Sequence, residues 1–504
     1  MKNLKFSLLL YATALILPLV AHSALTLYTT SWSMYGQTPY EYDGAYKNGL
    51  PYGRLRYVIN PEMVAQFNKA DVLAWSFLQV WNSQDPNQAL YQIPQAWDGL
   101  MHFDDLWGEL PLETYFGQFP APEASDFIKF CKANLGACSS VQVNGSTGLK
   151  ELFSYQDRKG VGQLNSFGAF INSPKYTAKR IIAVGGANTP ENKAISTATF
   201  DAIFANQDKF LKQFKAWMTH FKNLKGIDYD FEPPINPNTG GQLLPDERTI
   251  KDYRNLYNLV RASRESLGQE AYISVTITVN KEYLQTINQS VSGGWFKEIA
   301  KFVDSVNLMT YDLHGPWDYN SDPYTAVHAY LKQPETSRKD EFAINYAMDT
   351  ITEQVLSFGM PKEKLQVGLV AYGRGYSGVE PGENNEMPGF EQPWKGPSHF
   401  SNAYSNQEGM LPYKSVPKLI ADLHYQNYSV KTLDEKNNSI ITGAYLYNST
   451  SQQFIGYQSP ETVKAICEFV KAKGLKGVIM WSADTDLPVS DSNSLVATYK
   501  RDCQ

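Results

Sequence analysis

Short β-rich runs alternate with helix-like patterns along almost the whole chain, and this alternation limits the folds that the chain can adopt. We predict eight strands, at Leu25–Ser31, Val72–Phe77, Arg180–Val184, Gly226–Phe231, Tyr272–Val279, Val303–Thr310, Leu365–Tyr372 and Lys476–Trp481. The intervening helices include Phe200–Phe221, Ile250–Leu267, Phe342–Phe358 and Glu461–Lys473. Alternating strands and helices favour a parallel sheet. Eight such units favour an α/β fold closed as a (β/α)8 TIM barrel.

Two long intervals interrupt this rhythm. Residues 82–176 follow the second predicted strand and residues 373–457 follow the seventh. Since both follow a strand, both are expected at the C-terminal face of the barrel, where barrel enzymes place their sites. We predict that they form groove walls, with surface decoration as the alternative.

The composition fits one large folded unit without a nucleic-acid partner. Hydrophobic residues make up 43% and charged residues 19% of the 504 residues, which is ordinary for a chain with a large core. The length would suit about three average domains, but a barrel of this kind forms a single unit of about 250 residues or more. A net charge of −6 without a long basic run argues against nucleic-acid binding.

The first 24 residues have the pattern of a secretory signal peptide. Lys2 and Lys5 precede an apolar stretch from Leu8 to Val20, and small residues for cleavage follow at 21–24. A buried N-terminal helix is the alternative, but the apolar run is too short to span a membrane comfortably. We therefore expect a secreted, extracellular protein, with no membrane partner and a mature chain of residues 25–504.

Export would permit disulfide bonds. Cys131 and Cys138 could close a small loop, and Cys467 could pair with Cys503, although four cysteines allow three pairings. Neither the cysteines nor the seven scattered histidines form a metal-binding pattern. We expect no metal ion and no cofactor.

The most informative segment is the predicted fourth strand, where acids alternate with apolar residues. Asp228, Asp230 and Glu232 share one face of this strand. The other face carries the apolar residues Ile227, Tyr229 and Phe231. Stacked carboxyl groups inside a barrel repel one another and resist desolvation, which can raise one pKa enough to make a proton donor near neutral pH. We favour a catalytic interpretation over a solvated acidic edge strand.

This acidic segment and four further landmarks, in the expected order, resemble glycoside hydrolase family 18, the chitinases and their relatives. The segments that carry the resemblance are Ala183–Gly186, Gly226–Glu232, Met309–Asp318, Ala371–Gly375 and Gly477–Ser482. The resemblance covers nearly the whole mature chain. It also implies that residues 373–457 form a small α+β domain inserted between the seventh and eighth strands.

The resemblance implies a retaining hydrolase in which the substrate's own 2-acetamido group replaces a protein nucleophile. Glu232 would be the acid and then the base. Asp230 would hold the acetamido group and stabilise the intermediate, while Asp228 shares its proton. Tyr311 would donate its hydroxyl to the acetamido oxygen.

Further residues are expected to bind the sugar. Trp481 would form the floor of the subsite next to the cut, and Met309 and Asp312 would line the same pocket. Weaker candidates are Trp32, Tyr372, Arg374 and Phe77. Trp32 could instead be a core residue, Arg374 could cap the inserted domain and Phe77 could simply fill the barrel. Gly185 and Gly186 are interpreted as structural, since glycine allows close backbone approach.

Three positions depart from the family pattern. Lys225 replaces the first acid of the signature, Ala183 replaces a small hydroxyl residue, and Ala187 stands where bacterial relatives often carry a tryptophan. These changes are expected to alter rate and substrate preference rather than the type of reaction.

The leading hypothesis is a secreted chitinase that acts on chitin or N-acetyl-chitooligosaccharides. One alternative is an endo-β-N-acetylglucosaminidase acting on glycoprotein glycans. Another is a non-catalytic chitin-binding lectin of the same fold, which would typically lack Glu232. The sequence leaves open whether the chain is a subunit of a larger secreted assembly.

Overall fold

The computed structural model of the chain describes residues 23–30, 61–85, 98–103, 173–187, 195–232, 245–335, 347–401 and 407–503, with a few shorter stretches between these ranges. Several predictions fall outside the described residues: Trp32, the proposed Cys131–Cys138 loop and nearly all of the signal segment. Most of the interval 82–176 also lies outside them.

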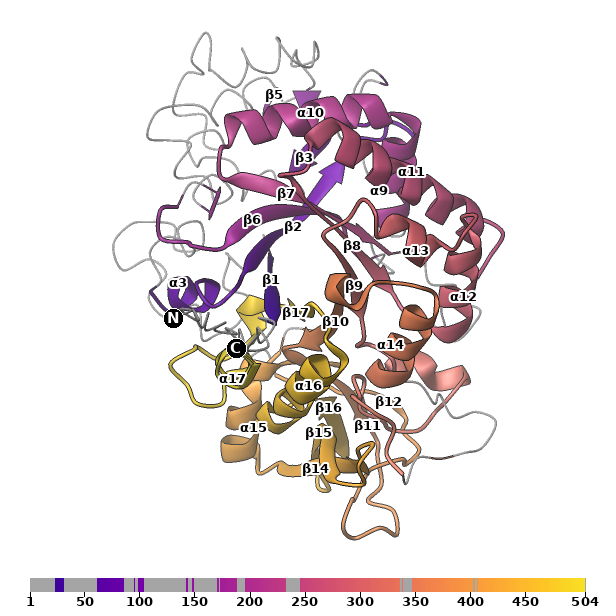
Figure 1. Cartoon of the computed structure of the whole chain (residues 1–504). Coiled ribbons are helices and arrows are strands. Elements are labelled where there is room, and N and C mark those ends of the chain that lie inside the picture. The colour runs from indigo at the N-terminus through magenta and orange to yellow at the C-terminus, as the bar shows by residue number, and fades with distance from the viewer. Residues whose placement is uncertain are drawn as a thin grey trace, which may run out of the picture.

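Eight parallel strands form a closed ring, because the last strand pairs back onto the first (Figure 1). In order around the ring they are β1 (Ala24–Thr30), β2 (Val72–Val80), β6 (Lys179–Gly185), β7 (Leu224–Phe231), β8 (Tyr272–Thr278), β9 (Ser305–Met309), β10 (Leu365–Val370) and β17 (Gly477–Trp481). The predicted (β/α)8 barrel is confirmed, and each predicted strand overlaps one of these eight.

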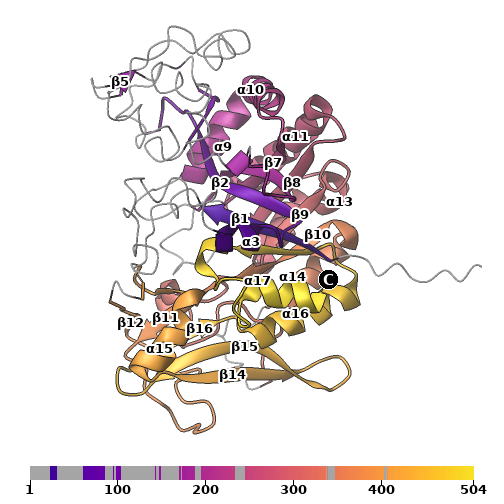
Figure 2. The ribbon, with the colours of Figure 1, turned by 90° about the vertical axis from the view of Figure 1, so that its left-hand side faces the viewer.

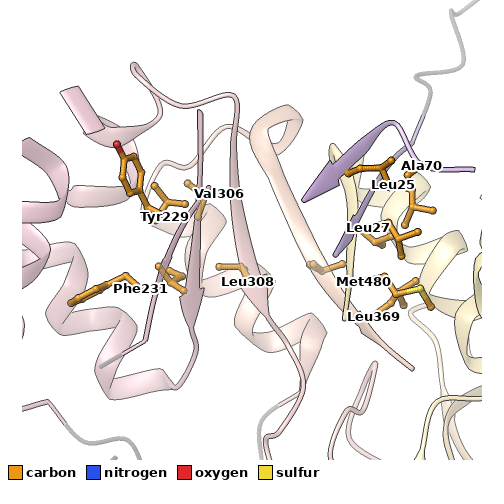
Figure 3. Packing of buried hydrophobic residues seen from close by; sticks show 14 of the residues in the cluster. Leu25, Leu27, Ala70, Tyr229, Phe231, Val306, Leu308, Leu369 and Met480 are labelled. Atoms are coloured by element: carbon orange, nitrogen blue, oxygen red, sulfur yellow. The ribbon is translucent and has the colours of Figure 1, made fainter. Parts of the chain in front are cut away.

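The strands alternate between residues that face the helices and residues that face the barrel interior. Tyr229 and Phe231 of β7 point outward into the main hydrophobic core, as do Leu308 of β9 and Met480 of β17 (Figure 3). The Tyr229 hydroxyl also reaches Ser263 of the surrounding helix layer, at 2.7 Å. Because side chains alternate along a strand, the residues between these outward ones are directed into the barrel.

Helices cover the outside of the barrel. They are α3 (Pro61–Phe67), α9 (Ile195–Ala205), α10 (Gln207–His220), α11 (Thr249–Leu267), α12 (Lys281–Gln289), α13 (Trp295–Ile299), α14 (Met348–Ser357), α16 (Pro460–Lys473) and α17 (Leu495–Cys503). The predicted helices Ile250–Leu267 and Glu461–Lys473 match α11 and α16 to within one residue.

The single helix predicted over Phe200–Phe221 is wrong. Two helices occupy this segment, and the first of them, α9, already begins at Ile195. Asn206 separates the two, since its backbone leaves the helical region at φ −131° and ψ 36°. Its side-chain amide donates to the Ala202 carbonyl oxygen at 3.0 Å, and such local bonds compete with a continuous helix.

The helix predicted over Phe342–Phe358 begins too early. The backbone of Ala347 is extended and α14 begins at Met348. The Thr350 hydroxyl donates to the carbonyl oxygen of Ala347 at 3.0 Å and accepts its N–H at 3.1 Å. These two bonds fix the helix start.

A second, antiparallel sheet is inserted between β10 and β17, as predicted. Its strands are β11 (Tyr372–Ser377), β12 (Gly396–Pro397), β13 (Met410–Pro412), β14 (Gln426–Leu433), β15 (Ser439–Asn448) and β16 (Gln453–Tyr457). Helix α15 (Val416–Leu423) joins β13 to β14. In Figures 1 and 2 this sheet lies to one side of the barrel, and β15 packs against the barrel helix α16. In the first long interval, β3 (Met101–Phe103) pairs with β2, and β4 (Gln142–Val143) pairs with β5 (Thr147–Gly148).

The two ends of the described chain meet at the same part of the barrel. The Ser23 and Tyr499 hydroxyls lie 2.6 Å apart, and Ala24 N–H donates to the Lys476 carbonyl oxygen at 2.8 Å. Cys467 of α16 and Cys503 of α17 form the disulfide predicted for them, with Cα atoms 5.3 Å apart. In the part of the chain that the structure describes, the helices lack the length or apolar character needed to cross a membrane.

Candidate active site

The three acids Asp228, Asp230 and Glu232 lie in a row along the barrel interior, at the C-terminal end of β7. Asp228 is completely buried and Asp230 is 3% exposed. Glu232 comes directly after the strand and is half-buried. The row therefore runs from a dry interior position to the rim, where a ligand would meet Glu232 first.

Asp228 is surrounded by hydrogen-bond donors from other strands of the barrel. The Tyr28 hydroxyl donates to Asp228 Oδ2 at 2.8 Å and the Ser274 hydroxyl donates to Oδ1 at 2.6 Å. The Thr276 hydroxyl lies 3.1 Å from Oδ1 and 3.0 Å from Oδ2. Hydrogen bonds from several donors stabilise a carboxylate that burial alone would disfavour.

Burial raises the pKa values of all three acids, and neighbouring carboxyl groups add to the rise at Asp230 and Glu232. Burial raises the pKa of Asp228, although its hydrogen bonds act in the opposite direction. Burial, then Glu232 and Asp228, raise the pKa of Asp230 well above its usual range. Burial, and then the charge of Asp312, raise the pKa of Glu232 to about 7. At mildly acidic pH the row thus holds protons, and Glu232 can act as an acid.

The glycine pair at the end of β6 lets the backbone approach the acid row closely. A Cβ atom on Gly185 would lie 2.1 Å from the Asp230 carbonyl oxygen, and one on Gly186 would lie 2.7 Å from the Phe77 ring. Gly186 N–H donates to the same carbonyl oxygen at 3.2 Å. Both glycines have positive φ, 115° and 98°. The structural interpretation of these glycines is supported by their contacts.

Trp481 ends β17 among aromatic neighbours at the same rim. Its ring stacks on Phe77, with centroids 5.4 Å apart and an interplanar angle of 16°, and lies 5.8 Å from the Tyr28 ring. Trp481 remains partly exposed, whereas Phe77 is 7% exposed. Phe77 therefore supports the indole from behind, and the indole is the surface that a sugar ring could contact.

Met309 and Tyr311 join the same aromatic cluster from the end of β9. Both are nearly buried, at 8% and 9% exposure. Gly368 makes room for Tyr311, because a Cβ atom there would lie 2.6 Å from the tyrosine ring. Burial, followed by the nearby charges, raises the pKa of Tyr311 well above 10. Its hydroxyl is thus a neutral donor throughout the working pH range of most enzymes.

Asp312 is fixed in place by three side chains. Arg374 donates through Nε to Oδ1 at 2.8 Å and through Nη2 to Oδ2 at 2.7 Å, and the Tyr372 hydroxyl donates to Oδ2 at 2.7 Å. His328 Nδ1 lies 3.0 Å from Oδ1. Burial would raise the pKa of Asp312, but Arg374 and His328 bring it well below its usual range. Asp312 therefore stays negatively charged.

The contacts of Arg374 link the insertion to Asp312. Its guanidinium binds Asp312, and it also lies 5.0 Å from the Trp317 ring centre. Tyr372 and Arg374 both belong to β11, the first strand of the insertion. The insertion thus contributes directly to the site, and Met410 of β13 packs against the same cluster.

Several residues around the acids were not singled out from the sequence. They are Tyr28, Ser274, Thr276 and Asn307, which surround Asp228, and His328, which contacts Asp312. The first four share a signal that was available, since each is a polar residue at an inward position of a barrel strand, where Val, Ile and Leu are usual. His328 lies between strands, in a segment with no such pattern.

The departures from the family pattern occupy different environments. Ala183 pairs with Asp228 in the sheet register and brings only a methyl group there. Lys225 is exposed, and its ammonium group donates to the Lys222 carbonyl oxygen at 2.6 Å. Ala187 is exposed. Among the residues that the structure describes, no cluster of His, Cys, Asp and Glu side chains could hold a metal ion.

Comparison with known proteins identifies the relatives of this barrel. The model for glycosyl hydrolases family 18 matches residues 25–486. Sporulation-specific chitinase 2 of Saccharomyces cerevisiae is 26% identical over 340 residues, which cover 64% of this chain and 57% of the yeast protein. Chitinase A1 of Niallia circulans is 26% identical over 353 residues, covering 68% of this chain and 45% of that protein. The chain thus spans about half the length of these curated relatives.

A solved structure shows the same fold over nearly the full length. The Group IV chitinase of Ostrinia furnacalis superposes with a TM-score of 0.60 at 18% identity. The match covers 95% of this chain and 99% of that one. It supports the barrel together with its inserted sheet.

Proposed function

The chain belongs to glycosyl hydrolases family 18, and from this premise we propose that it is a chitinase that hydrolyses the β-1,4 bonds between N-acetylglucosamine units. The observation that carries the proposal is the acid row. Two buried carboxyl groups, Asp228 and Asp230, lead to a single acid, Glu232, whose pKa is raised to about 7 at the rim of the barrel. One proton donor near neutral pH is what cleavage of a glycosidic bond requires.

In the proposed first step, Glu232 transfers its proton to the glycosidic oxygen while the bond from that oxygen to the anomeric carbon breaks. The carbonyl oxygen of the substrate's 2-acetamido group attacks the anomeric carbon and forms an oxazolinium-like intermediate. A water molecule then attacks the same carbon, the bond from that carbon to the acetamido oxygen breaks, and Glu232 takes a proton from the water. Two displacements at one carbon retain its configuration.

Asp230 and Tyr311 are assigned to the acetamido group. Asp230 would accept the amide N–H and stabilise the positive charge that develops on the ring, and the Tyr311 hydroxyl would donate to the acetamido oxygen. Asp228 would share one proton with Asp230. The burial of all three groups supports these roles, because electrostatic interactions are stronger where water is excluded.

The remaining candidates are assigned to sugar binding and to positioning. Trp481 would form the floor under the sugar next to the cut, with Phe77 supporting the indole, and Met309 would line the pocket. The ionised Asp312, held by Tyr372 and Arg374, would keep the pKa of Glu232 high and present an acceptor to sugar hydroxyls. Trp32 stays a predicted stacking residue.

Chitin or N-acetyl-chitooligosaccharides are the proposed substrates, and the extracellular space is the proposed location. The signal-like residues 1–24 support export, while the net negative charge argues against nucleic-acid partners. The inserted sheet favours chitin over a short, open site, since its Met410 packs against the same hydrophobic cluster as Trp481.

Activity is expected to fall as the pH rises through about 7. Burial and Asp312 raise the pKa of Glu232 to about 7, and the acid must be protonated to act. Below that pH Glu232 carries its proton, so the alkaline limb of kcat/KM should have its midpoint near 7. A pH profile with a chitooligosaccharide substrate measures this midpoint. A midpoint near the usual glutamate pKa of about 4.3 would contradict the proposed environment.

The alternative with the same chemistry is an endo-β-N-acetylglucosaminidase acting on glycoprotein glycans, and a third is a lectin. Incubating the protein with fluorogenic N-acetyl-chitooligosaccharides and, separately, with a high-mannose glycoprotein distinguishes these activities. We expect turnover of the chitooligosaccharides. Release of the protein-linked glycan alone would favour the endo-glycosidase, and binding of chitooligosaccharides without turnover would favour the lectin.

A further inference from the structure

Thr276 connects Asp228 to the side-chain amide of Asn307. Asn307 Nδ2 donates to the Thr276 hydroxyl oxygen at 2.9 Å. That hydroxyl lies within hydrogen-bond distance of both oxygens of Asp228. Asn307 Nδ2 also faces Asp228 Oδ1 at 3.4 Å, a place where the amide oxygen would be repelled. The orientation of the Asn307 amide is thus set by the carboxylate.

This orientation makes the Thr276 oxygen the acceptor of the Asn307 amide hydrogen. The same oxygen also lies 2.8 Å from the Tyr28 hydroxyl oxygen, so the single hydrogen of the Thr276 hydroxyl can point to Asp228 directly or to Tyr28, which itself donates to Asp228. The Ser274 and Tyr28 hydroxyls also donate to Asp228, at 2.6 and 2.8 Å. An ionised Asp228 can accept all of these hydrogen bonds. A protonated Asp228 carries a hydrogen on one oxygen and could not accept from all of the donors.

The donors to Asp228 come from three strands, β1, β8 and β9. On β6, the residue in register with Asp228 is Ala183, which has no hydroxyl. On β8, the residues in register with Asp228 and Asp230 are Ser274 and Thr276. Strands β6 and β8 lie on opposite sides of β7. Thr276 of β8 therefore supplies a hydroxyl to Asp228, whereas Ala183 of β6 supplies none.

We propose that Thr276, oriented by Asn307, is a positioning residue that keeps Asp228 ionised and so holds the shared proton on Asp230, in place of the hydroxyl that is missing at Ala183. The inference rests on the proposed function and refines it. It assigns the resting proton to the acid nearer the substrate.

The charges around Asp228 agree with this assignment. The titratable groups that face it are Asp230 on its own strand, Tyr28 on β1 and Tyr272 on β8. Burial raises the pKa of both tyrosines, so both are neutral. Burial and two neighbouring acids raise the pKa of Asp230 well above its usual range, while the hydroxyl donors oppose the rise at Asp228.

The test is the pH dependence of kcat in Thr276→Val, which removes the hydroxyl and keeps the shape. The variant loses a hydrogen-bond donor that stabilises the ionised form of Asp228, which should raise the pKa of Asp228. The acid limb of the kcat profile should therefore shift to higher pH by about one unit. The alkaline limb, set by Glu232, should stay where it is. KM should remain within about twofold of wild type, because Thr276 is not assigned to the sugar.

Rescue and control variants separate positioning from a general loss of structure. Ala183→Ser combined with Thr276→Val returns a hydroxyl to Asp228 from β6 and should move the acid limb back toward wild type. Thr26→Val removes a buried hydroxyl that contacts Gln366 instead of an acid, and should leave both limbs unchanged. Should Thr276→Val fail to fold, Asn307→Leu removes the orienting donor and should shift the acid limb in the same direction.

An active Thr276→Val enzyme with an unshifted acid limb would overturn the inference and leave the proposed function intact. So would a double variant that shifts as far as Thr276→Val alone. Absence of chitooligosaccharide turnover by the wild-type protein would instead overturn the proposed function, and the inference with it.

Discussion

Replacing Glu232 by Gln is expected to lower kcat on fluorogenic N-acetyl-chitooligosaccharides by about a hundredfold or more, with a much smaller change in KM. Glutamine keeps the size of the side chain but cannot supply the proton that the leaving oxygen needs. The raised pKa of Glu232, at about 7, is the property that the substitution removes. Steady-state kinetics of the two proteins measures the effect.

The matched control for this variant is Glu363→Gln. Glu363 is exposed in the turn that precedes β10, at the end of the barrel away from the acid row. We expect wild-type kinetics from it. If Glu232→Gln retained wild-type turnover as well, Glu232 would not be the acid.

Replacing Asp230 by Asn is expected to give the second largest loss, about a hundredfold in kcat. An amide keeps the shape but cannot pass the shared proton to Asp228 and so cannot become negatively charged when the positive intermediate forms, and electrostatic groups of this kind contribute about two to three orders of magnitude in rate. It also ends the exchange of a proton with Asp228. The substitution should weaken binding of the sugar in the ground state only slightly, so KM should change far less than kcat.

Asp208→Asn is the corresponding control, since Asp208 is exposed in the first turn of α10. Its kinetics should match the wild type. A variant with Asn at 230 that kept more than about half of the wild-type kcat would remove Asp230 from the charge-stabilising role.

The barrel and the acid row could be predicted from the sequence because both depend on short-range periodicity. Strands of similar length alternate with helices, and in β7 the acids alternate with Tyr229 and Phe231. The structure places these aromatic residues in the core and Asp228 and Asp230 in the interior. Helical periodicity does not predict a break that a single side chain causes, such as the one at Asn206 between α9 and α10.

The surroundings of the acids could not be predicted with the same ease, because they depend on contacts between distant segments. Tyr28 reaches Asp228 across 200 positions, and Arg374 reaches Asp312 across 62. Only closure of the barrel and insertion of the second sheet bring these pairs together. Polar residues at inward positions of barrel strands, such as Thr276, could have been recognised from the sequence as neighbours of the acids. No comparable pattern marks His328.

Ala183 illustrates how a departure from a family pattern depends on its surroundings. Taken alone, the loss of a hydroxyl beside the acids predicts a weaker site. In the folded chain, Thr276 and Asn307 supply donors to the same carboxylate from two other strands. The effect of Ala183 is therefore to be measured together with Thr276.

The most direct test of the proposed mechanism compares two substrates in the wild-type protein. One is a fully acetylated chitooligosaccharide, and the other is the same oligosaccharide without the acetyl group on the sugar next to the cut. If the acetamido carbonyl is the nucleophile, the acetylated substrate is cleaved with retention and the deacetylated one is cleaved at least about a hundredfold more slowly. Cleavage of both at equal rates would contradict substrate assistance, and with it the roles given to Asp230 and Tyr311.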